Sequence, residues 1–382
     1  MMYLKADGIA SIAADYQTTM VAAIKTAYLS VRGSVPVSFY SLPLFDATGD
    51  LNEDFLRMLL TAPFPTLSTT YPWVQDYLDI GRMLHSYTRE RTGWSKLVTS
   101  QPLGKNTFYA AMRRDYLERY HIAHLLTTYP ISSSTINPFI GSDDKINGLL
   151  RQYRHIYNGW NKVISLFIEY SMLDKDLLAK IKTAANLEVC PYCNRQYITS
   201  FYSSGTKYIP ADLDHFYPQS LFPLFSLSLY NLIPSCLVCN RFLKGDSFQD
   251  IWHPYQDGFN DNVHFAVDNP KSVTSLIGDN TAFTLSLQNT SPPNTDEHTL
   301  IDNTIAFFKL EDIYQIHKQY VRELLYKKHA YNDSYLRQLQ DIFRTSGISV
   351  SEANLILYGH EIDATKIHER PLGKLSYDII NM

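Results

Sequence analysis

Cysteine is scarce in this chain: its 382 residues include only four, Cys190, Cys193, Cys236 and Cys239. That number is too small for a disulfide-rich secreted scaffold. The sequence also lacks an uninterrupted run of about 18 apolar residues, which argues against a membrane span. Its first residues do not combine a basic segment with an apolar one, so no secretory signal is visible. We therefore expect a cytoplasmic protein that has no association with a membrane.

An excess of one charge is missing as well. The chain has 34 Lys and Arg residues against 38 Asp and Glu, and a formal net charge of −4. Such a balance does not by itself indicate nucleic-acid binding, so a polyanionic substrate would require locally concentrated basic residues, a metal or a partner. Hydrophobic residues are plentiful at 45%, with 28 Tyr and 19 Phe. This composition predicts a packed core, and the length suggests two or three domains.

Helical periodicity dominates the first part of the chain. Apolar residues recur at helical spacing over 9–31, 71–90, 107–129 and 145–173, separated by turn-rich segments. We therefore predict a mostly helical N-terminal region, 1–185, that serves for docking or regulation or contacts nucleic acid.

Strand-like patterns begin near residue 186. Residues 195–202 and 207–215 read as two strands joined by a turn, and 261–268 and 281–287 read as two more. Two further helices are expected at 304–345, in broken form, and at 351–360, while 368–380 has no clear period. The predicted fold class is α+β, mainly α. Its predicted regions are 1–185, 186–265 and a mostly helical 266–382.

The four cysteines form two Cys-x2-Cys pairs and leave none over. Each pair can present two thiolates from one tight turn, and two such turns complete a tetrahedral zinc site. The alternative is four ordinary buried cysteines, which are common in protein cores. The matched spacing favours zinc. A site with four sulfur ligands has no open position, so we expect this zinc to be structural.

Chemistry-bearing residues lie inside this cysteine frame, in the segment ADLDHFYPQSLFPLFSLSLYNLIPSCLVCNRFLKG. An Asp-His pair is followed by a proline, by an asparagine ahead of the second cysteine pair, and by an asparagine and a lysine after it. These residues are Asp214, His215, Pro218, Asn231, Asn240 and Lys244. In this order they resemble the HNH nucleases, the ββα-metal family. The resemblance covers Cys190 to Lys244 and departs from the commonest pattern at Asn240, where many members have His.

The resemblance implies a role for each of these residues. His215 would be the general base, which suits an imidazole whose pKa lies near neutrality. Asp214 and Asn240 would hold a catalytic Mg²⁺ or Mn²⁺ through hard oxygen ligands. Asn231 would orient the imidazole, and Lys244 would meet a phosphate. Neighbours on an extended strand point to opposite faces, so the strand must end or bend at Asp214 and His215 for both side chains to reach one phosphate.

Two other residues near the motif have alternative interpretations. Asp212 alternates with Asp214 along the predicted strand, so it is either a supporting carboxylate of the site or a surface charge. His253 follows the motif and either approaches the metal or packs in the turn that leaves the core.

Two locally basic stretches could contact phosphates. One runs from Arg82 to Arg119, and its bases include Arg89, Arg91, Lys96, Arg113 and Arg114. The other contains Lys318, Arg322, Lys327 and Lys328. Each stretch is either a nucleic-acid-contacting face or simply the solvated face of a helix.

The motif predicts hydrolysis of a phosphodiester, with DNA favoured as the substrate. The DLDHFYPQS and NLIPSCLVCNRFLKGD blocks also resemble HNH effectors of bacterial anti-phage systems, such as the Septu-type nucleases. That resemblance implies an ATPase partner. Two alternatives stay open: an RNase or tRNA-cleaving toxin, and a catalytically silent zinc module that binds nucleic acid or protein. An oligomer is compatible with the sequence.

Overall fold

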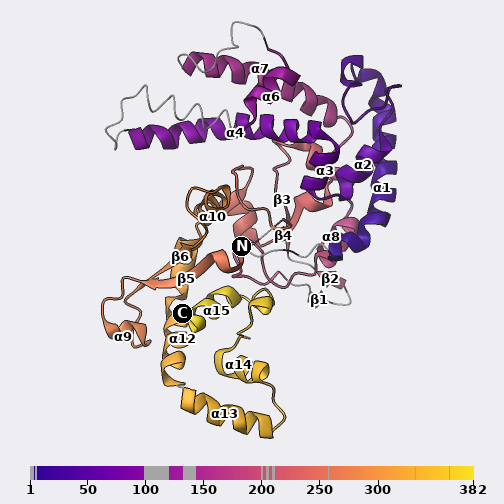
Figure 1. Cartoon of the computed structure of the whole chain (residues 1–382). Helices are drawn as coiled ribbons and strands as arrows, with labels where there is room; N and C mark the ends of the chain where they lie inside the picture. The colour runs from indigo at the N-terminus through magenta and orange to yellow at the C-terminus, as the bar shows by residue number, and fades with distance from the viewer. Residues whose placement is uncertain are drawn as a thin grey trace.

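The protein is described by a computed structural model over residues 4, 7–98, 120–131, 143–198, 201–203, 206–208, 211–256, 258–331, 333–360 and 362–382. In this part of the chain the architecture is mainly helical, with three small antiparallel sheets of two strands each. The predicted fold class, α+β and mainly α, is confirmed. Figure 1 shows the N-terminal helices at the top, the C-terminal helices at the bottom, and β3 and β4 between them.

The described part of the N-terminal region contains five longer helices and two short ones, α3 and α6. In chain order the helices are α1 (Asp7–Val31), α2 (Glu53–Thr61), α3 (Phe64–Thr70), α4 (Pro72–Val98), α6 (Ile122–Thr128), α7 (Asp143–Ile164) and α8 (Lys175–Ala185). Helix α1 packs against α2 and α8, and α4 packs against α3 and α7. Side chains stabilise the starts of two helices: Asn52 accepts the Phe55 N–H at α2, and Asp174 accepts the Leu177 N–H at α8.

Helix α6 matches the end of the helix that the sequence predicts at 107–129. The first part of that prediction lies outside the described residues.

The strands form local pairs. β1 (Phe201–Ser203) pairs with β2 (Thr206–Tyr208), β3 (Asp212–His215) with β4 (Leu232–Ser235), and β5 (Val263–Asp268) with β6 (Thr284–Asn289). The strand predicted at 207–215 is therefore two strands with different partners. β2 forms a tight hairpin with β1. In contrast, β3 ends at His215 and pairs with β4, which begins only at Leu232.

The long connection between β3 and β4 is anchored to the N-terminal helices. The Tyr157 hydroxyl donates to the Leu221 carbonyl at 2.9 Å, and the Tyr16 hydroxyl donates to the Leu227 carbonyl at 2.6 Å. Phe222 and Phe225 from this connection pack against the Tyr77 ring. Helices α1, α4 and α7 thus hold the loop that precedes β4.

The C-terminal region contains β5, β6 and the helices α9 (Val273–Leu276), α10 (Asp296–Phe307), α11 (Leu310–Tyr314), α12 (Lys318–Ala330), α13 (Asp333–Thr345), α14 (Val350–Tyr358) and α15 (Gly373–Asn381). The helix predicted at 304–345 is indeed broken. Helix α15 was not predicted; it packs against β5, where Asp378 accepts the Phe265 N–H at 2.8 Å.

A continuous cluster of buried apolar side chains connects the N-terminal, central and C-terminal parts. The predicted boundaries near 185 and 265 stay predictions. No helix in the described ranges combines the length and the apolar character needed to cross a membrane.

Candidate functional site

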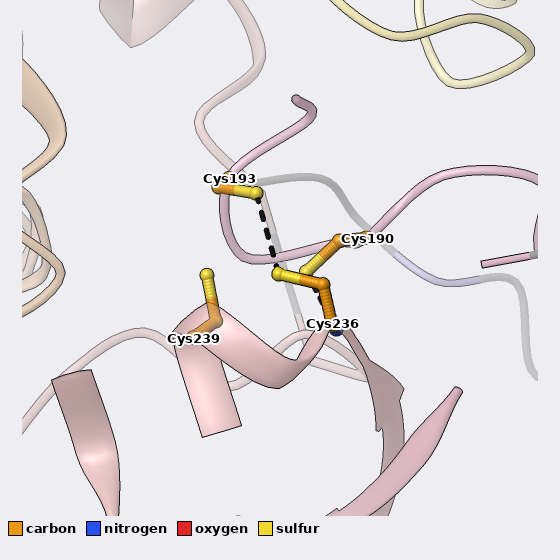
Figure 2. Close-up of side chains that lie close together, drawn as sticks. All are labelled: Cys190, Cys193, Cys236 and Cys239. Atoms are coloured by element: carbon orange, nitrogen blue, oxygen red, sulfur yellow. Dashed lines mark hydrogen bonds between the residues drawn. The ribbon is translucent and has the colours of Figure 1, made fainter. Parts of the chain in front are cut away.

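The four cysteines come together as the spacing predicts. Their sulfur atoms all lie within 4.8 Å of one another and all four residues are buried. Figure 2 shows the side chains turned toward a common centre. The Sγ atoms of Cys193 and Cys236 are 3.9 Å apart. Zn–S bonds of about 2.3 Å in a tetrahedron give a sulfur separation of about 3.8 Å, so the spacing is consistent with a zinc site.

Each cysteine pair has its own local support. The first lies in a turn closed by hydrogen bonds from Cys190 N–H to the Gln196 carbonyl and from Asn194 N–H to the Cys190 carbonyl. The second leads into a π-helical segment, η7 (Val238–Lys244). The Cys236 N–H also points at the Cys190 sulfur, 3.4 Å away. These contacts tie β4 and η7 to the first cysteine turn.

The hairpin β3–β4 runs directly into the second cysteine pair. In its register Asp214 faces Ile233 and His215 faces Leu232. Chain order in this segment is therefore strand, strand, helix, with the Asp-His pair at the end of the first strand. The cysteine cluster fixes the end of the second strand and the start of the helix.

Asp214 is buried with two strong hydrogen-bond donors. The Tyr192 hydroxyl donates to Oδ2 at 2.6 Å, and the Lys244 ammonium donates to Oδ1 at 2.9 Å. The side chains of Asp214 and Lys244 are each 2% exposed. Lys244 also donates to the His215 carbonyl at 2.6 Å. Lys244 is thus an internal partner of the Asp-His pair, where the sequence had suggested a phosphate contact.

Tyr192 is a site residue that the sequence analysis missed. It stands between the two cysteines of the first pair, and its ring stacks on Phe308 with 4.5 Å between centroids. Burial and the adjacent Asp214 carboxylate raise the pKa of the Tyr192 hydroxyl well above its ordinary value, so it stays a donor. The sequence signal that could have indicated Tyr192 is its position inside the first Cys-x-x-Cys pair, directly before the predicted zinc ligand Cys193.

The His215 imidazole has a defined orientation. Its Nε2 lies 3.0 Å from the Ser226 carbonyl, which can only accept, so Nε2 carries the hydrogen and Nδ1 keeps its lone pair. Burial lowers the pKa of His215, the Ser226 carbonyl and the Asp214 carboxylate oppose that shift, and the Lys244 charge adds to it, so that the pKa is lowered on balance. The Tyr170 ring meets the imidazole edge-on at 4.7 Å. The arrangement therefore favours a neutral imidazole with a free basic nitrogen.

Asn231 bonds to the loop between the two strands. Its Oδ1 accepts the Tyr217 N–H at 2.8 Å, and its Nδ2 donates to the carbonyls of Tyr217 and Phe225. No hydrogen bond joins this amide to His215 within the described residues. Asn231 instead secures the loop whose Ser226 carbonyl holds the imidazole. Its predicted influence on His215 would therefore be indirect.

Asn240 lies on η7 and is partly exposed. Its carbonyl accepts the Gly245 N–H at 2.7 Å, the i to i+5 bond of a π-helical turn, a geometry found frequently at functional sites. Its carboxamide makes no hydrogen bond to another described residue, which leaves its oxygen available as a ligand. Its predicted role as a metal ligand stays a prediction.

The two neighbouring candidates have other contacts. Asp212 receives a two-point hydrogen bond from Arg241 of η7, at 2.8 and 3.0 Å, and both side chains retain some solvent exposure. His253 is buried against the rings of Phe64 and Phe216. Burial lowers the pKa of His253 to about 3, which keeps it neutral. Its surroundings are those of a core side chain.

The basic stretches are only partly described. Arg113 and Arg114 lie outside the described residues, as do the side chains of Arg89, Arg91 and Lys96. Arg82 is paired with Asp250 at 2.8 Å. On α12, Arg322 donates to the Gly278 carbonyl and Lys328 to the Met382 carbonyl. Several of the described basic side chains thus bind to other groups of the protein itself.

A polar cleft of about 780 Å³ opens beside Tyr170. Its walls include Asn158 and Lys162 from α7, Gln219 from the loop after β3, and Asp246 just beyond η7. Because the Tyr170 ring also touches His215, this cleft approaches the imidazole. The sequence analysis gave no indication of it, since its walls come from distant segments.

Comparisons of the chain with protein-family models, with curated proteins and with solved structures found no match.

Proposed function

We propose that this chain is a metal-dependent HNH endonuclease that hydrolyses phosphodiester bonds, with DNA as the favoured substrate, and that its cysteine cluster holds a structural zinc ion. The observation that carries the proposal is the arrangement around β3. An imidazole whose Nε2 is fixed by a backbone carbonyl directly follows a buried carboxylate on this strand. Both are tied to a four-cysteine centre through β4 and η7.

His215 would act on the attacking water. Its Nε2–H is held by the Ser226 carbonyl, so Nδ1 is the atom that accepts the proton. The lowered pKa keeps the imidazole unprotonated near neutral pH, as a general base requires. Tyr170 packs against the ring and restricts its rotation.

Asp214 and Asn240 are the proposed ligands of the catalytic Mg²⁺ or Mn²⁺. One carboxylate and one amide oxygen are donors that these ions accept, with water and phosphate completing the shell. The position beside Asp214 already accommodates a cation, the Lys244 ammonium. A bound divalent ion would neutralise charge on the phosphate. Tyr192 holds the Asp214 carboxylate in place through its hydrogen bond to Oδ2.

The cleft lined by Lys162, Gln219 and Asp246 is the proposed approach for the substrate. Most of its lining side chains are polar, and one of them, Tyr170, contacts the His215 ring. The anti-phage role with an ATPase partner rests on the sequence resemblance alone.

The test is cleavage of supercoiled plasmid, linear duplex, single-stranded DNA and total tRNA by purified protein with Mg²⁺, Mn²⁺ or EDTA. We expect metal-dependent cutting that is lost in His215→Ala and kept in His329→Ala, a matched change of an exposed histidine on α12. Elemental analysis should find a zinc ion in both variants. A folded, zinc-loaded His215→Ala protein that cuts at the wild-type rate would overturn the proposal.

Cutting confined to tRNA would instead support the RNase alternative. If folded wild-type protein cuts nothing, the assay is repeated with the ATPase partner that the resemblance implies.

A further inference from the structure

A charged carboxylate as deeply buried as Asp214 requires a cation beside it. Its side chain is 2% exposed, and the only cation bonded to it among the described residues is Lys244, 2.9 Å from Oδ1. Removing the partner of such a pair leaves an uncompensated buried charge, which is strongly unfavourable. While Asp214 is charged, the site therefore needs a cation at this position.

A divalent ion bound to Asp214 would compete for that same position. Two cations a few ångströms apart repel strongly where burial reduces the dielectric screening. The carboxylate has a second neighbour, Tyr192, but this hydroxyl is neutral and can remain in place when the cation changes. Lys244 and a metal ion are thus alternative partners of one carboxylate.

Lys244 is placed where such an exchange is feasible. It is the last residue of η7, and Gly245 follows with φ of +51°, a conformation that favours glycine. Asp246, two residues beyond Lys244, lines the polar cleft. Because the lysine stem is long and flexible, we expect this side chain to move in such an exchange while β3 and the cysteine cluster stay in place.

We propose that Lys244 is an internal counter-cation that closes the Asp214 site, and that a divalent ion enters by displacing its ammonium group. This inference rests on the proposed function, in which Asp214 and Asn240 hold the catalytic ion. It adds a resting state in which the Lys244 ammonium neutralises Asp214. A divalent ion binds to Asp214 only after this ammonium has left.

The first test uses zinc-loaded wild-type protein. Lysines are acylated with an amine-reactive ester, with and without Mn²⁺, and each site is quantified by mass spectrometry. We expect Lys244 to be protected without Mn²⁺ and labelled with it. Lys374, which forms a second buried pair with Asp378 at 2.8 Å, should stay protected throughout. Exposed Lys271 should always be labelled. Unchanged protection of Lys244 while Mn²⁺ binds would overturn the inference.

The second test measures Mn²⁺ binding from the electron paramagnetic resonance signal of the free ion. Lys244→Met should bind Mn²⁺ ~10-fold more tightly or better, because the closed state no longer competes. Arg241→Met, which removes an exposed cation of the same helix, should bind like wild type. The double variant Asp214→Asn, Lys244→Met should lose this binding.

The outcomes separate the two proposals. Equal affinity of wild type and Lys244→Met, lost on changing Asp214, would overturn the closing role and leave the metal-dependent nuclease intact. Absence of Asp214-dependent binding in every variant would overturn both the closing role and the metal dependence of the proposed function.

Discussion

Two ion pairs connect β3 to η7, and they differ in surroundings far more than in sequence. Asp212 and Asp214 are two residues apart on one strand, and their partners Arg241 and Lys244 are three apart on one helix. The Arg241 and Asp212 side chains are 64% and 23% exposed. Those of Lys244 and Asp214 are 2% exposed each. Two positions along the same strand thus separate a solvent-exposed ion pair from a buried one.

The difference shows why hydrogen-bond geometry alone does not rank the two pairs. The Asp212 pair has the better geometry, since Arg241 makes two parallel bonds. Water screens it, however, and competes for both partners. The Asp214 pair is protected from water and depends on each member, because either charge left alone would be buried. We therefore expect the inner pair to contribute more to stability than the outer one.

The largest expected effect comes from breaking the inner pair. Asp214→Ala leaves the Lys244 ammonium buried without its carboxylate, and we expect the free energy of unfolding to fall by about 3–5 kcal/mol. Urea denaturation of the zinc-loaded protein, followed by tyrosine fluorescence and circular dichroism, measures the change. A loss no greater than that of Asp212→Ala would show that the inner pair is not buried as described.

A smaller effect should follow from removing the third member of the inner cluster. Tyr192→Phe deletes the hydroxyl that donates to Asp214 Oδ2 but keeps the ring stacked on Phe308. A hydrogen bond to a charged group contributes about 1.5–3 kcal/mol, so we expect a loss of that order in the same denaturation experiment. The matched control is Tyr326→Phe, an exposed tyrosine of α12, which should leave stability unchanged.

The cysteine cluster was the most predictable part of the site. Each Cys-x-x-Cys pair is a local feature, and the pairing of the two turns needed only the count of four. The helices α1 and α14 and the strands β5 and β6 were also predicted close to their observed bounds, because their apolar spacing is regular. Helix α15 was missed because it follows Pro371, begins with Gly373 and is too short to show a clear period.

The contacts of the inner pair could not be predicted from spacing. Four residues separate Asn240 from Lys244, which indicates a shared helical face but not the burial of that face. Burial depends on where Tyr192 and the β3 strand end stand in three dimensions. The position of Asn231 shows the same limit. The motif identified the residue, while its bonds to the Tyr217 and Phe225 backbone depend on the fold of the connecting loop.

The smallest expected effect comes from breaking the outer pair, and its value lies in the contrast. Asp212→Ala removes the carboxylate that Arg241 contacts, but Arg241 is free to turn into water. We therefore expect no measurable shift of the urea midpoint at physiological salt. Repeating the measurement at low salt should reveal whatever attraction screening had hidden. A destabilisation comparable to that of Asp214→Ala would mean that Asp212, not Asp214, holds η7 to the strand, and would reverse the roles assigned to the two carboxylates.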